Sequence, residues 1–396
     1  MNAPRLGQRD LFPDLRVRAY LNHAAISPLS QPVREAAGRA LAQLARDGSV
    51  SFAERLIERQ QLRDDLARLM HAQSTEIALV PSTLYGLAAL ATSLPWRQGA
   101  RVIAFEGEYP TNVSVWQRAC SRYGLTLTML PVADLARPDE PDWSALEREL
   151  RRGDVQLCAV SAVQFQSGLR VPLQRMAALC HAHGAQLAVD AVQALGSVPF
   201  DVRALGVDYA AAGSHKWLMG CDGAGVLFVR SELLPQLKPA FAGAFSHVDA
   251  ELLFVQPGQL RYDRPLRNEA RLFEGGMLSS VSLSALSASV KILLTLGVES
   301  IYRHVNAYND VLEAGLVARG FRSLRTADAA RRSCTLGVQP GPESRLGASQ
   351  IAGELTARGV VCSAPDGVLR FAPHFANGLH EVAEVLTVLD GLGEKA

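Results

Sequence analysis

Short apolar segments alternate with amphipathic ones along the first 230 residues of the chain. Segments made mostly of apolar residues predict strands at 76–80, 101–105, 125–132, 157–163, 186–190, 208–213 and 225–230. Apolar residues at helical spacing predict helices between them, at 84–94, 111–124, 143–153 and 172–184. Strands that lack polar alternation are typical of a mainly parallel sheet with helices on both faces. The pattern therefore predicts an α/β fold.

The pattern changes in the last part of the chain. It predicts one long helix at 283–320, a strand at 333–340, a helix at 349–359, strands at 360–364 and 367–373, and a last helix at 378–395. This mixture is typical of a smaller α+β domain, which we place at 286–396 after a large domain at 26–285. Residues 1–25 lack periodicity, and we expect this N-terminal segment to lie across a domain or a partner chain.

Composition and charge narrow the class of protein. A chain of 396 residues with 48% hydrophobic residues can bury a large core and favours two domains. A net charge of +1 gives no sign of a nucleic-acid or membrane partner. No apolar run could span a bilayer, and the first residues lack the apolar core of a signal peptide. The six cysteines form no metal-ligand spacing, so we expect buried thiols, a cytoplasmic protein and no metal.

Polar side chains follow the ends of several predicted strands, where ligands bind in an open α/β sheet. These positions hold Ser82 and Thr83, Glu108 and Tyr109, Gln164, Asp190 with Gln193 after it, and Ser214, His215 and Lys216. Each group alone has a simpler explanation, such as a helix cap, a core aromatic ring or a surface lysine. Together they supply a lysine, a carboxylate, an aromatic ring and phosphate-binding hydroxyls at a helix start. That combination is what pyridoxal phosphate needs.

Residues 188–230 resemble the core of the class V aminotransferase family, which has fold type I of the pyridoxal-phosphate enzymes. The D-x-x-Q motif at Asp190, followed by S-H-K at Ser214, carries the resemblance. It extends from YLNHAAISPL at 20–29 to LRFAPHFANGLHEV at 369–382. The family includes cysteine desulfurases, isopenicillin N epimerase-like proteins and several aminotransferases. The resemblance implies a large cofactor-binding domain with a mainly parallel sheet, a smaller C-terminal domain and a homodimer.

The resemblance implies a cofactor-binding role for each matching residue. Lys216 would form a Schiff base with the cofactor and then carry the α-proton of the substrate. Asp190 would pair with the pyridine nitrogen, and Gln193 would hydrogen-bond the phenolic oxygen. The phosphate would be held by four positions in two turns: Thr83, the backbone at Leu84, Ser214 and His215.

The resemblance also implies a substrate side of the site. Tyr109 occupies the place of a histidine in the desulfurases and would stack on the cofactor ring. Arg370 would hold a substrate carboxylate, a task that suits a planar guanidinium. Asn22 and His23 would border the substrate.

Two departures from the family pattern bear on the expected chemistry. Relatives often have FE-x-GTPN, whose threonine reaches the phosphate of the neighbouring subunit, whereas this chain has Met277 at that place. Desulfurases also carry a catalytic cysteine on a longer loop before the arginine. Here Cys362 lies in a predicted strand, and we expect a small buried thiol.

The sequence therefore predicts a pyridoxal-phosphate enzyme that acts on an amino acid, with an aminotransferase as the leading interpretation. An amino-acid epimerase, or a carbon–sulfur lyase or cysteine desulfurase-like enzyme, stays open, because these reactions use the same lysine, aspartate and phosphate site. A non-catalytic protein of this fold is the third alternative. The presence of Lys216, Asp190 and Arg370 together argues against it.

Overall fold

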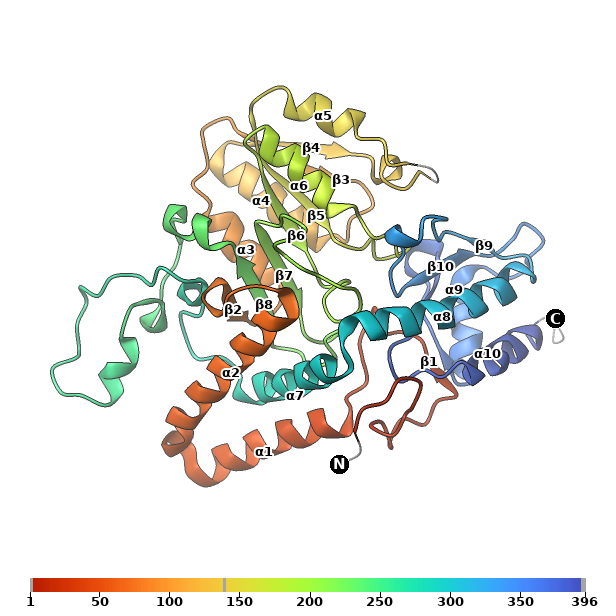
Figure 1. Ribbon diagram of the computed structural model, residues 1–396, viewed down its shortest axis with the longest axis horizontal. Coiled ribbons are helices and arrows are strands. Elements are labelled where there is room, and N and C mark those ends of the chain that lie inside the picture. Colours follow the sequence, from red (N-terminus) through yellow and green to blue (C-terminus); the bar gives the residue numbers. More distant parts are fainter. Residues whose placement is uncertain (1–2, 138–139, 393–396) are drawn as a thin grey trace.

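A computed structural model describes residues 3–137 and 140–392 of the protein. Over these residues the large domain contains a seven-stranded sheet in the order β2-β8-β7-β6-β5-β3-β4 (Figure 1). Every pair from β4 to β7 is parallel, and β8 runs antiparallel to β7 and β2. The predicted α/β fold with a mainly parallel sheet is confirmed. The strands are β2 (Ile77–Val80), β3 (Arg101–Phe105), β4 (Thr126–Leu130), β5 (Val155–Ser161), β6 (Gln186–Asp190), β7 (Tyr209–Gly213) and β8 (Gly225–Val229).

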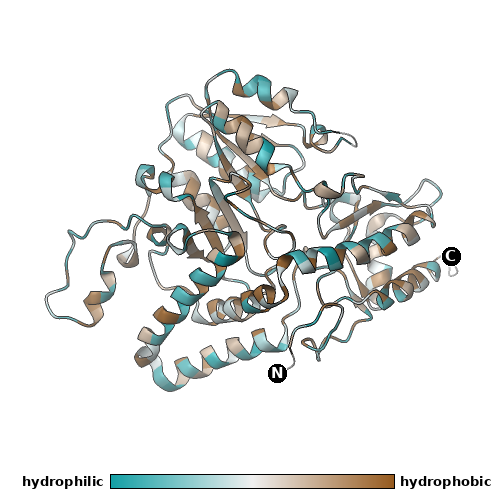
Figure 2. Cartoon of the chain, viewed as in Figure 1, coloured by the Kyte–Doolittle hydropathy of each residue, from teal (hydrophilic) through white to brown (hydrophobic). Residues whose placement is uncertain are grey.

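Both faces of the sheet are buried, which explains why its strands lack polar alternation. Successive residues of one strand enter different cores: Ile77 and Leu79 pack in one, Ala78 and Val80 in the other. The apolar strands lie between more polar helices (Figure 2). Helices that cover the sheet are α3 (Thr83–Ser93), α4 (Thr111–Tyr123), α5 (Ser144–Leu150) and α6 (Leu173–Ala182).

Three further helices frame the sheet, and two of them were not predicted. Helices α1 (Gln31–Asp47) and α2 (Phe52–Met70) both pack against α7 (Ser280–Leu296). The prediction of one long helix at 283–320 is wrong, because Gly297, with φ 75°, ends α7 and starts α8 (Val298–Val317).

Among the described residues no single helix is long and apolar enough to cross a membrane. Only the α7–α8 pair, which is bent by 78°, has the length and composition of a membrane span when its two helices are taken together.

The C-terminal unit carries two small sheets in the part of the chain that the structure describes. Strands β9 (Arg322–Ser323), β10 (Leu336–Gln339) and β12 (Leu369–Phe371) are antiparallel, while β1 (Ala19–Tyr20) pairs in parallel with β11 (Val360–Val361). The N-terminal segment therefore joins the C-terminal unit. Helices α9 (Ala348–Ala357) and α10 (His380–Asp390) cover these strands, and the predicted helical residues 393–395 lie outside the described ranges. The predicted boundary between 285 and 286 falls inside α7 and stays a prediction.

Short 3-10 helices occur at turns along the described chain. They are Gly48–Ser51, Ser74–Glu76, Val132–Asp134, Ser231–Gln236, Ala244–Ser246, Ala250–Phe254, Ala270–Phe273, Ala329–Arg331 and Pro365–Gly367.

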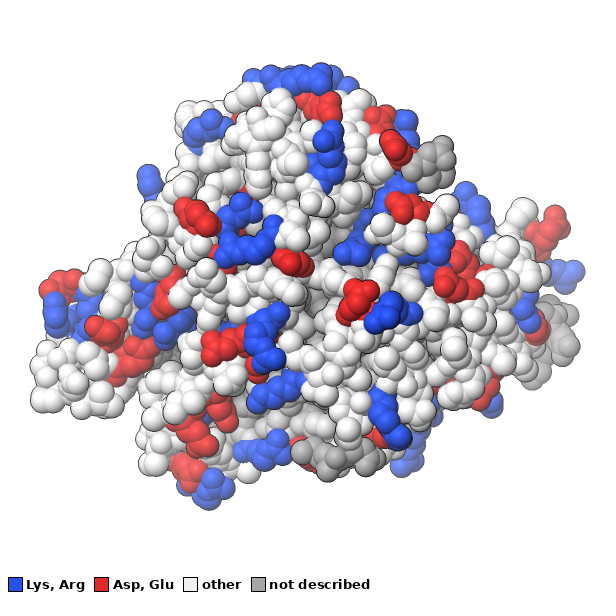
Figure 3. All heavy atoms as spheres, in the orientation of Figure 1, with Lys and Arg blue, Asp and Glu red and all other residues white. Residues whose placement is uncertain are grey.

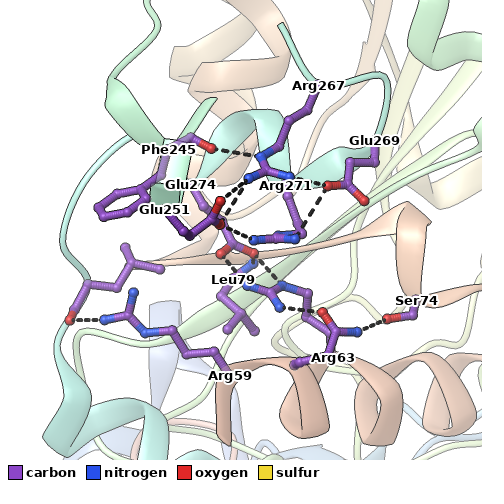
Figure 4. Close-up of polar contacts among 12 residues, drawn as sticks. Arg59, Arg63, Ser74, Leu79, Phe245, Glu251, Arg267, Glu269, Arg271 and Glu274 are labelled. Atoms are coloured by element: carbon purple, nitrogen blue, oxygen red, sulfur yellow. Dashed lines mark hydrogen bonds and ion pairs between the residues drawn. The ribbon is translucent and has the colours of Figure 1, made fainter. Parts of the chain in front are cut away.

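Residues 241–271 form an arm that extends away from the large domain (Figure 1, green to teal). Within the arm, Arg267 and Arg271 both pair with Glu251 at 2.9 Å (Figure 4). The chain returns to the sheet at Glu274, whose buried carboxylate receives two hydrogen bonds from Arg63, at 2.8 and 2.7 Å, and one from the backbone N–H of Leu79 at 2.8 Å. A paired and fully hydrogen-bonded buried carboxylate holds this return firmly.

Candidate active site

The carboxyl ends of β5, β6 and β7 lie side by side and place the first site residues together. Ser161 at the end of β5 is opposite Asp190 at the end of β6, and Asp190 is opposite Ala211 of β7. β7 continues into the turn at 214–219 that carries Lys216. The expected convergence of these ends is therefore present.

Lys216 is partly buried, and its amine faces an aromatic ring. Its Nζ lies 5.4 Å from the centre of the Tyr109 ring. Burial lowers the pKa of the Lys216 amine; the charge of Asp190 opposes this shift and that of Arg370 adds to it. A lowered pKa increases the neutral, nucleophilic fraction of an amine at neutral pH.

Asp190 is a buried carboxylate with few groups around it that stabilise its charge. Only 3% of the residue is exposed, and its Oδ1 accepts a hydrogen bond of 2.9 Å from the N–H of Val192. Burial raises the pKa of Asp190 to about 7; the Val192 N–H and Lys216 lower it, and the charge of Glu108 raises it. No cation forms an ion pair with Asp190 in the described part of the chain, so a protonated ring nitrogen would find an unpaired acceptor here.

A small cradle lies between the start of α3 and the lysine turn. The N–H of Gly213 donates to Thr83 Oγ1 at 2.8 Å. A Cβ on Gly213 would lie 3.2 Å from the His215 ring and 3.4 Å from Thr83 Oγ1, so the glycine keeps this space open. The first N–H groups of a helix, here those of Thr83 and Leu84, have no partner within the helix and suit a phosphate. Burial lowers the pKa of His215, whose Nδ1 lies 3.8 Å from Asp222.

Two other predicted cofactor residues use their polar atoms within the protein. Ser214 is fully buried, and its hydroxyl donates to the carbonyl of Cys221. The Gln193 amide accepts from Trp217 Nε1 at 2.8 Å and donates to the carbonyl of Ala24 at 3.0 Å. Their contacts with a phosphate and a phenolic oxygen stay predictions.

Arg370 presents a buried cation without an acidic partner in the described residues. It is 5% exposed, and its guanidinium donates to the carbonyl of Phe165 at 2.8 Å and to Ser363 Oγ at 3.2 Å. Burial lowers the pKa of Arg370 to about 10. The Phe165 ring also contacts Tyr109 edge-on, at 5.6 Å between ring centres. A carboxylate beside Arg370 would therefore lie close to the aromatic wall of the site.

The two N-terminal candidates differ in position. His23 is 2% exposed, its Nδ1 hydrogen-bonds Ser27 at 2.7 Å, and its ring packs near Trp217. Its side chain therefore packs against the lysine turn. Asn22 bridges to Ala372, and its buried Oδ1 has no hydrogen-bond partner among the described residues. Asn22 is thus the candidate that keeps a polar atom for a ligand.

Glu108 is a site residue to which the sequence analysis assigned no role. Its carboxylate accepts from the N–H of Ser161 at 2.6 Å, from the Ser161 hydroxyl, and from Asn112 Nδ2 at 3.1 Å. Burial raises the pKa of Glu108 despite these hydrogen bonds. Its place three residues after β3 and directly before Tyr109 was the available signal.

These residues fit pyridoxal phosphate on the geometry of the chain itself. The glycine-lined cradle suits the phosphate, the unpaired Asp190 suits the ring nitrogen, and Tyr109 lies over the amine that would hold the aldehyde.

Comparisons with known proteins agree with this arrangement. A solved structure of a C-DES mutant, with glycine covalently linked to its PLP cofactor, matches with a TM-score of 0.87 and 22% identity over 96% of this chain and 98% of that chain. The apo cysteine desulfurase from Thermococcus onnurineus NA1 matches with a TM-score of 0.85 and 21% identity over 100% of both chains.

Sequence relatives include one uncharacterized aminotransferase and several cysteine desulfurases. The uncharacterized aminotransferase YcbU of Bacillus subtilis is 29% identical over 96% of this chain and 95% of its own length. A cysteine desulfurase of Dickeya dadantii is 32% identical over 62% of this chain and 57% of its own length. The model of the family "Aminotransferase class-V" matches residues 19–388. The chain therefore belongs to the class-V aminotransferase family of pyridoxal-phosphate-dependent enzymes.

Proposed function

We propose that this protein is an aminotransferase for an α-amino acid, with Lys216 as its covalent anchor and proton carrier. The observation that carries the proposal is the arrangement of the Lys216 amine against Tyr109 with Asp190 and Arg370, which are both buried and lack an ion-pair partner among the described residues. Bound pyridoxal phosphate supplies an electron sink for charge that develops at the substrate α-carbon. Arg370 orients the substrate through its carboxylate, and the neutral Lys216 Nζ accepts the α-proton.

The state of the thiols supports an aminotransferase over a desulfurase. A desulfurase needs an accessible cysteine thiolate. Cys362 is 7% exposed in the core of the C-terminal unit, and burial raises the pKa of its thiol to about 12. Cys221 is half-buried, and burial raises its pKa as well. The remaining cysteines are buried free thiols: Cys120, Cys158, Cys180 and Cys334.

A carbon–sulfur lyase is the second candidate, because it requires no such thiolate. The solved C-DES structure in complex with cysteine persulfide is described as a cystine C–S lyase, and it has the same fold as this chain at 22% identity. An assay of amino acids with and without an added 2-oxo acid separates the candidates. Consumption that requires the oxo acid supports the aminotransferase. Release of pyruvate and sulfur species without it would replace that proposal with the lyase, and racemisation alone would replace it with an epimerase.

The covalent role of Lys216 can be tested separately. The chain contains four lysines, Lys216, Lys238, Lys291 and Lys395. Borohydride reduction of the cofactor-loaded protein should attach the cofactor to Lys216, as read by peptide mass spectrometry. Attachment to another lysine would contradict the proposal.

A cytoplasmic homodimer completes the proposal. Large apolar side chains are exposed along the arm and after it: Phe241, Leu253, Phe254, Val255, Leu260, Tyr262, Leu266 and Met277. Large apolar side chains exposed in such number on one segment favour an interface. The charged side chains on the viewed face are of mixed sign (Figure 3). Free thiols favour the cytoplasm.

Sedimentation of Tyr262→Asp should give monomers if the arm contributes to the dimer; an unchanged dimer would exclude that contribution.

A further inference from the structure

Three consecutive backbone carbonyls of the lysine turn accept hydrogen bonds from distant parts of the chain. The N–H of Ser27 donates to the His215 carbonyl at 2.8 Å, and the Ser27 hydroxyl donates to the Lys216 carbonyl at 2.6 Å. His374 Nε2 bonds the Trp217 carbonyl at 3.1 Å. Each donor is buried, so water does not replace it readily.

The turn itself needs support. Met219, which closes it by donating to the Lys216 carbonyl at 2.9 Å, has φ 51°, an unfavourable backbone conformation for a residue with a side chain. Such a conformation persists only where neighbouring contacts hold it. The donors from Ser27 and His374 are those contacts on the carbonyl side.

The hydrogen bonds determine the tautomers of both histidines. His374 Nδ1 accepts from the N–H of Phe375 at 2.7 Å, so its Nε2 carries the proton that bonds Trp217. The Ser27 hydroxyl has one proton and gives it to the Lys216 carbonyl, so His23 Nδ1 must donate to Ser27. Burial lowers the pKa of both histidines, which lie 5.1 Å apart between ring centres, and keeps them neutral.

Both donors are attached to the segment that carries Arg370. His374 lies four residues after Arg370, just beyond the end of β12. His23 donates its backbone N–H to the Ala372 carbonyl at 3.1 Å, in the same segment. Buried hydrogen bonds therefore connect the lysine turn to residues 372–374, and the chain leads from there directly back to Arg370.

We propose that His374 and the His23–Ser27 pair are positioning residues that hold the turn of Lys216 in register with Arg370. Within the described part of the chain their side chains form no hydrogen bond with the amine or the guanidinium, and they act through the backbone of the turn. The inference rests on the proposed role of Lys216. In this inference, side chains outside the substrate site fix the distance between the proton-carrying Lys216 amine and the guanidinium that binds the substrate carboxylate.

The test uses Ser27→Ala and His374→Leu, which each remove one donor, and His374→Gln, which keeps a donor at the position of Nε2. Ser93→Ala is the matched control, because the buried Ser93 hydroxyl donates to the Ala89 carbonyl at 2.6 Å within α3. In cofactor-free protein, the rate of Lys216 modification by cyanate is followed against pH by mass spectrometry. In loaded protein, kcat and KM are measured for the amino donor.

We expect Ser27→Ala and His374→Leu to raise the pH midpoint of Lys216 modification by about half a unit, because a loosened turn exposes the amine to water. We expect kcat to fall about fivefold, which is the rate change that corresponds to the net free energy of one hydrogen bond. KM should change less than twofold. His374→Gln should recover most of kcat, and Ser93→Ala should match wild type. If His374→Leu does not fold, the result for Ser27→Ala decides whether the inference holds.

Unchanged midpoint and kcat in a folded Ser27→Ala would overturn the inference, as would an equal effect of Ser93→Ala. Because the pH midpoint of Lys216 modification is measured without cofactor, it tests the positioning of the amine alone. Borohydride attachment away from Lys216 would refute the proposed function while leaving the midpoint to support or overturn the positioning of the amine.

Discussion

Replacing Asp190 with asparagine should stabilise the cofactor-free protein, by an amount that grows with pH. The reason is that burial raises the pKa of this carboxyl from 3.8 to about 7. Between these values the unfolded chain has lost the proton that the folded protein keeps, so the wild-type free energy of unfolding falls as pH rises. An asparagine has no such titration, and its Oδ1 can still accept the 2.9 Å hydrogen bond from Val192.

The magnitude follows from the pKa difference. One pKa unit corresponds to about 1.4 kcal/mol, so the shift of Asp190 from 3.8 to about 7 represents about 4 kcal/mol. Below pH 3.8 both states are protonated and the carboxyl costs nothing; above pH 7 the cost is complete. The Asp190→Asn variant should therefore equal wild type at acid pH and exceed it by up to about 4 kcal/mol at pH 8.

The assay is urea unfolding of cofactor-free wild type and variant between pH 4 and pH 8, with the difference plotted against pH. Asp154→Asn is the control, because the hydrogen bond from Arg101 lowers the pKa of Asp154 from 3.8. Its carboxyl is ionised in both states above about pH 5, so the difference between this variant and wild type should stay constant from there to pH 8. A flat curve for Asp190→Asn would refute the reasoning, since it would mean that the carboxyl has a partner in the folded protein. With cofactor bound, the variant should instead hold the cofactor less tightly than wild type.

Four further variants test individual roles. Lys216→Ala should abolish turnover and covalent attachment while the cofactor still binds; turnover at the wild-type rate would refute its role. Arg370→Lys should raise KM for α-carboxylate substrates by about 10-fold or more with the cofactor absorption unchanged, and a silent variant would indicate an amine substrate without a carboxylate. Cys362→Ser should retain most activity and wild type should form no persulfide with cysteine; loss of activity together with a trapped persulfide would favour a desulfurase. Tyr109→Ala should weaken cofactor binding by about tenfold in an absorbance titration, whereas equal binding would place the ring elsewhere.

The helix break at Gly297 illustrates a limit of periodicity. Apolar spacing continues through 283–320, so the pattern predicts one helix, and the glycine alone does not decide between a tolerated residue and a break. The 78° bend depends on packing, because α7 lies against α1 and α2 while α8 crosses to the C-terminal unit. Helix α2 was not predicted for a different reason: it buries several charged residues, such as Arg63 and Asp65, which obscure an apolar face.

The sequence by itself determined the sheet and the identity of the residues at its edge. Buried strands must be apolar throughout, and the carboxyl ends of parallel strands meet, so Asp190 and Lys216 could be placed together from local patterns. Only the tertiary structure decided which polar atoms remain available. Ser214 and Gln193 use theirs within the protein, and Nδ1 of His23 bonds Ser27. These outcomes depend on hydrogen bonds between segments far apart in the chain, such as the bond from Ser27 to the Lys216 carbonyl, and no local pattern encodes the partner of such a bond.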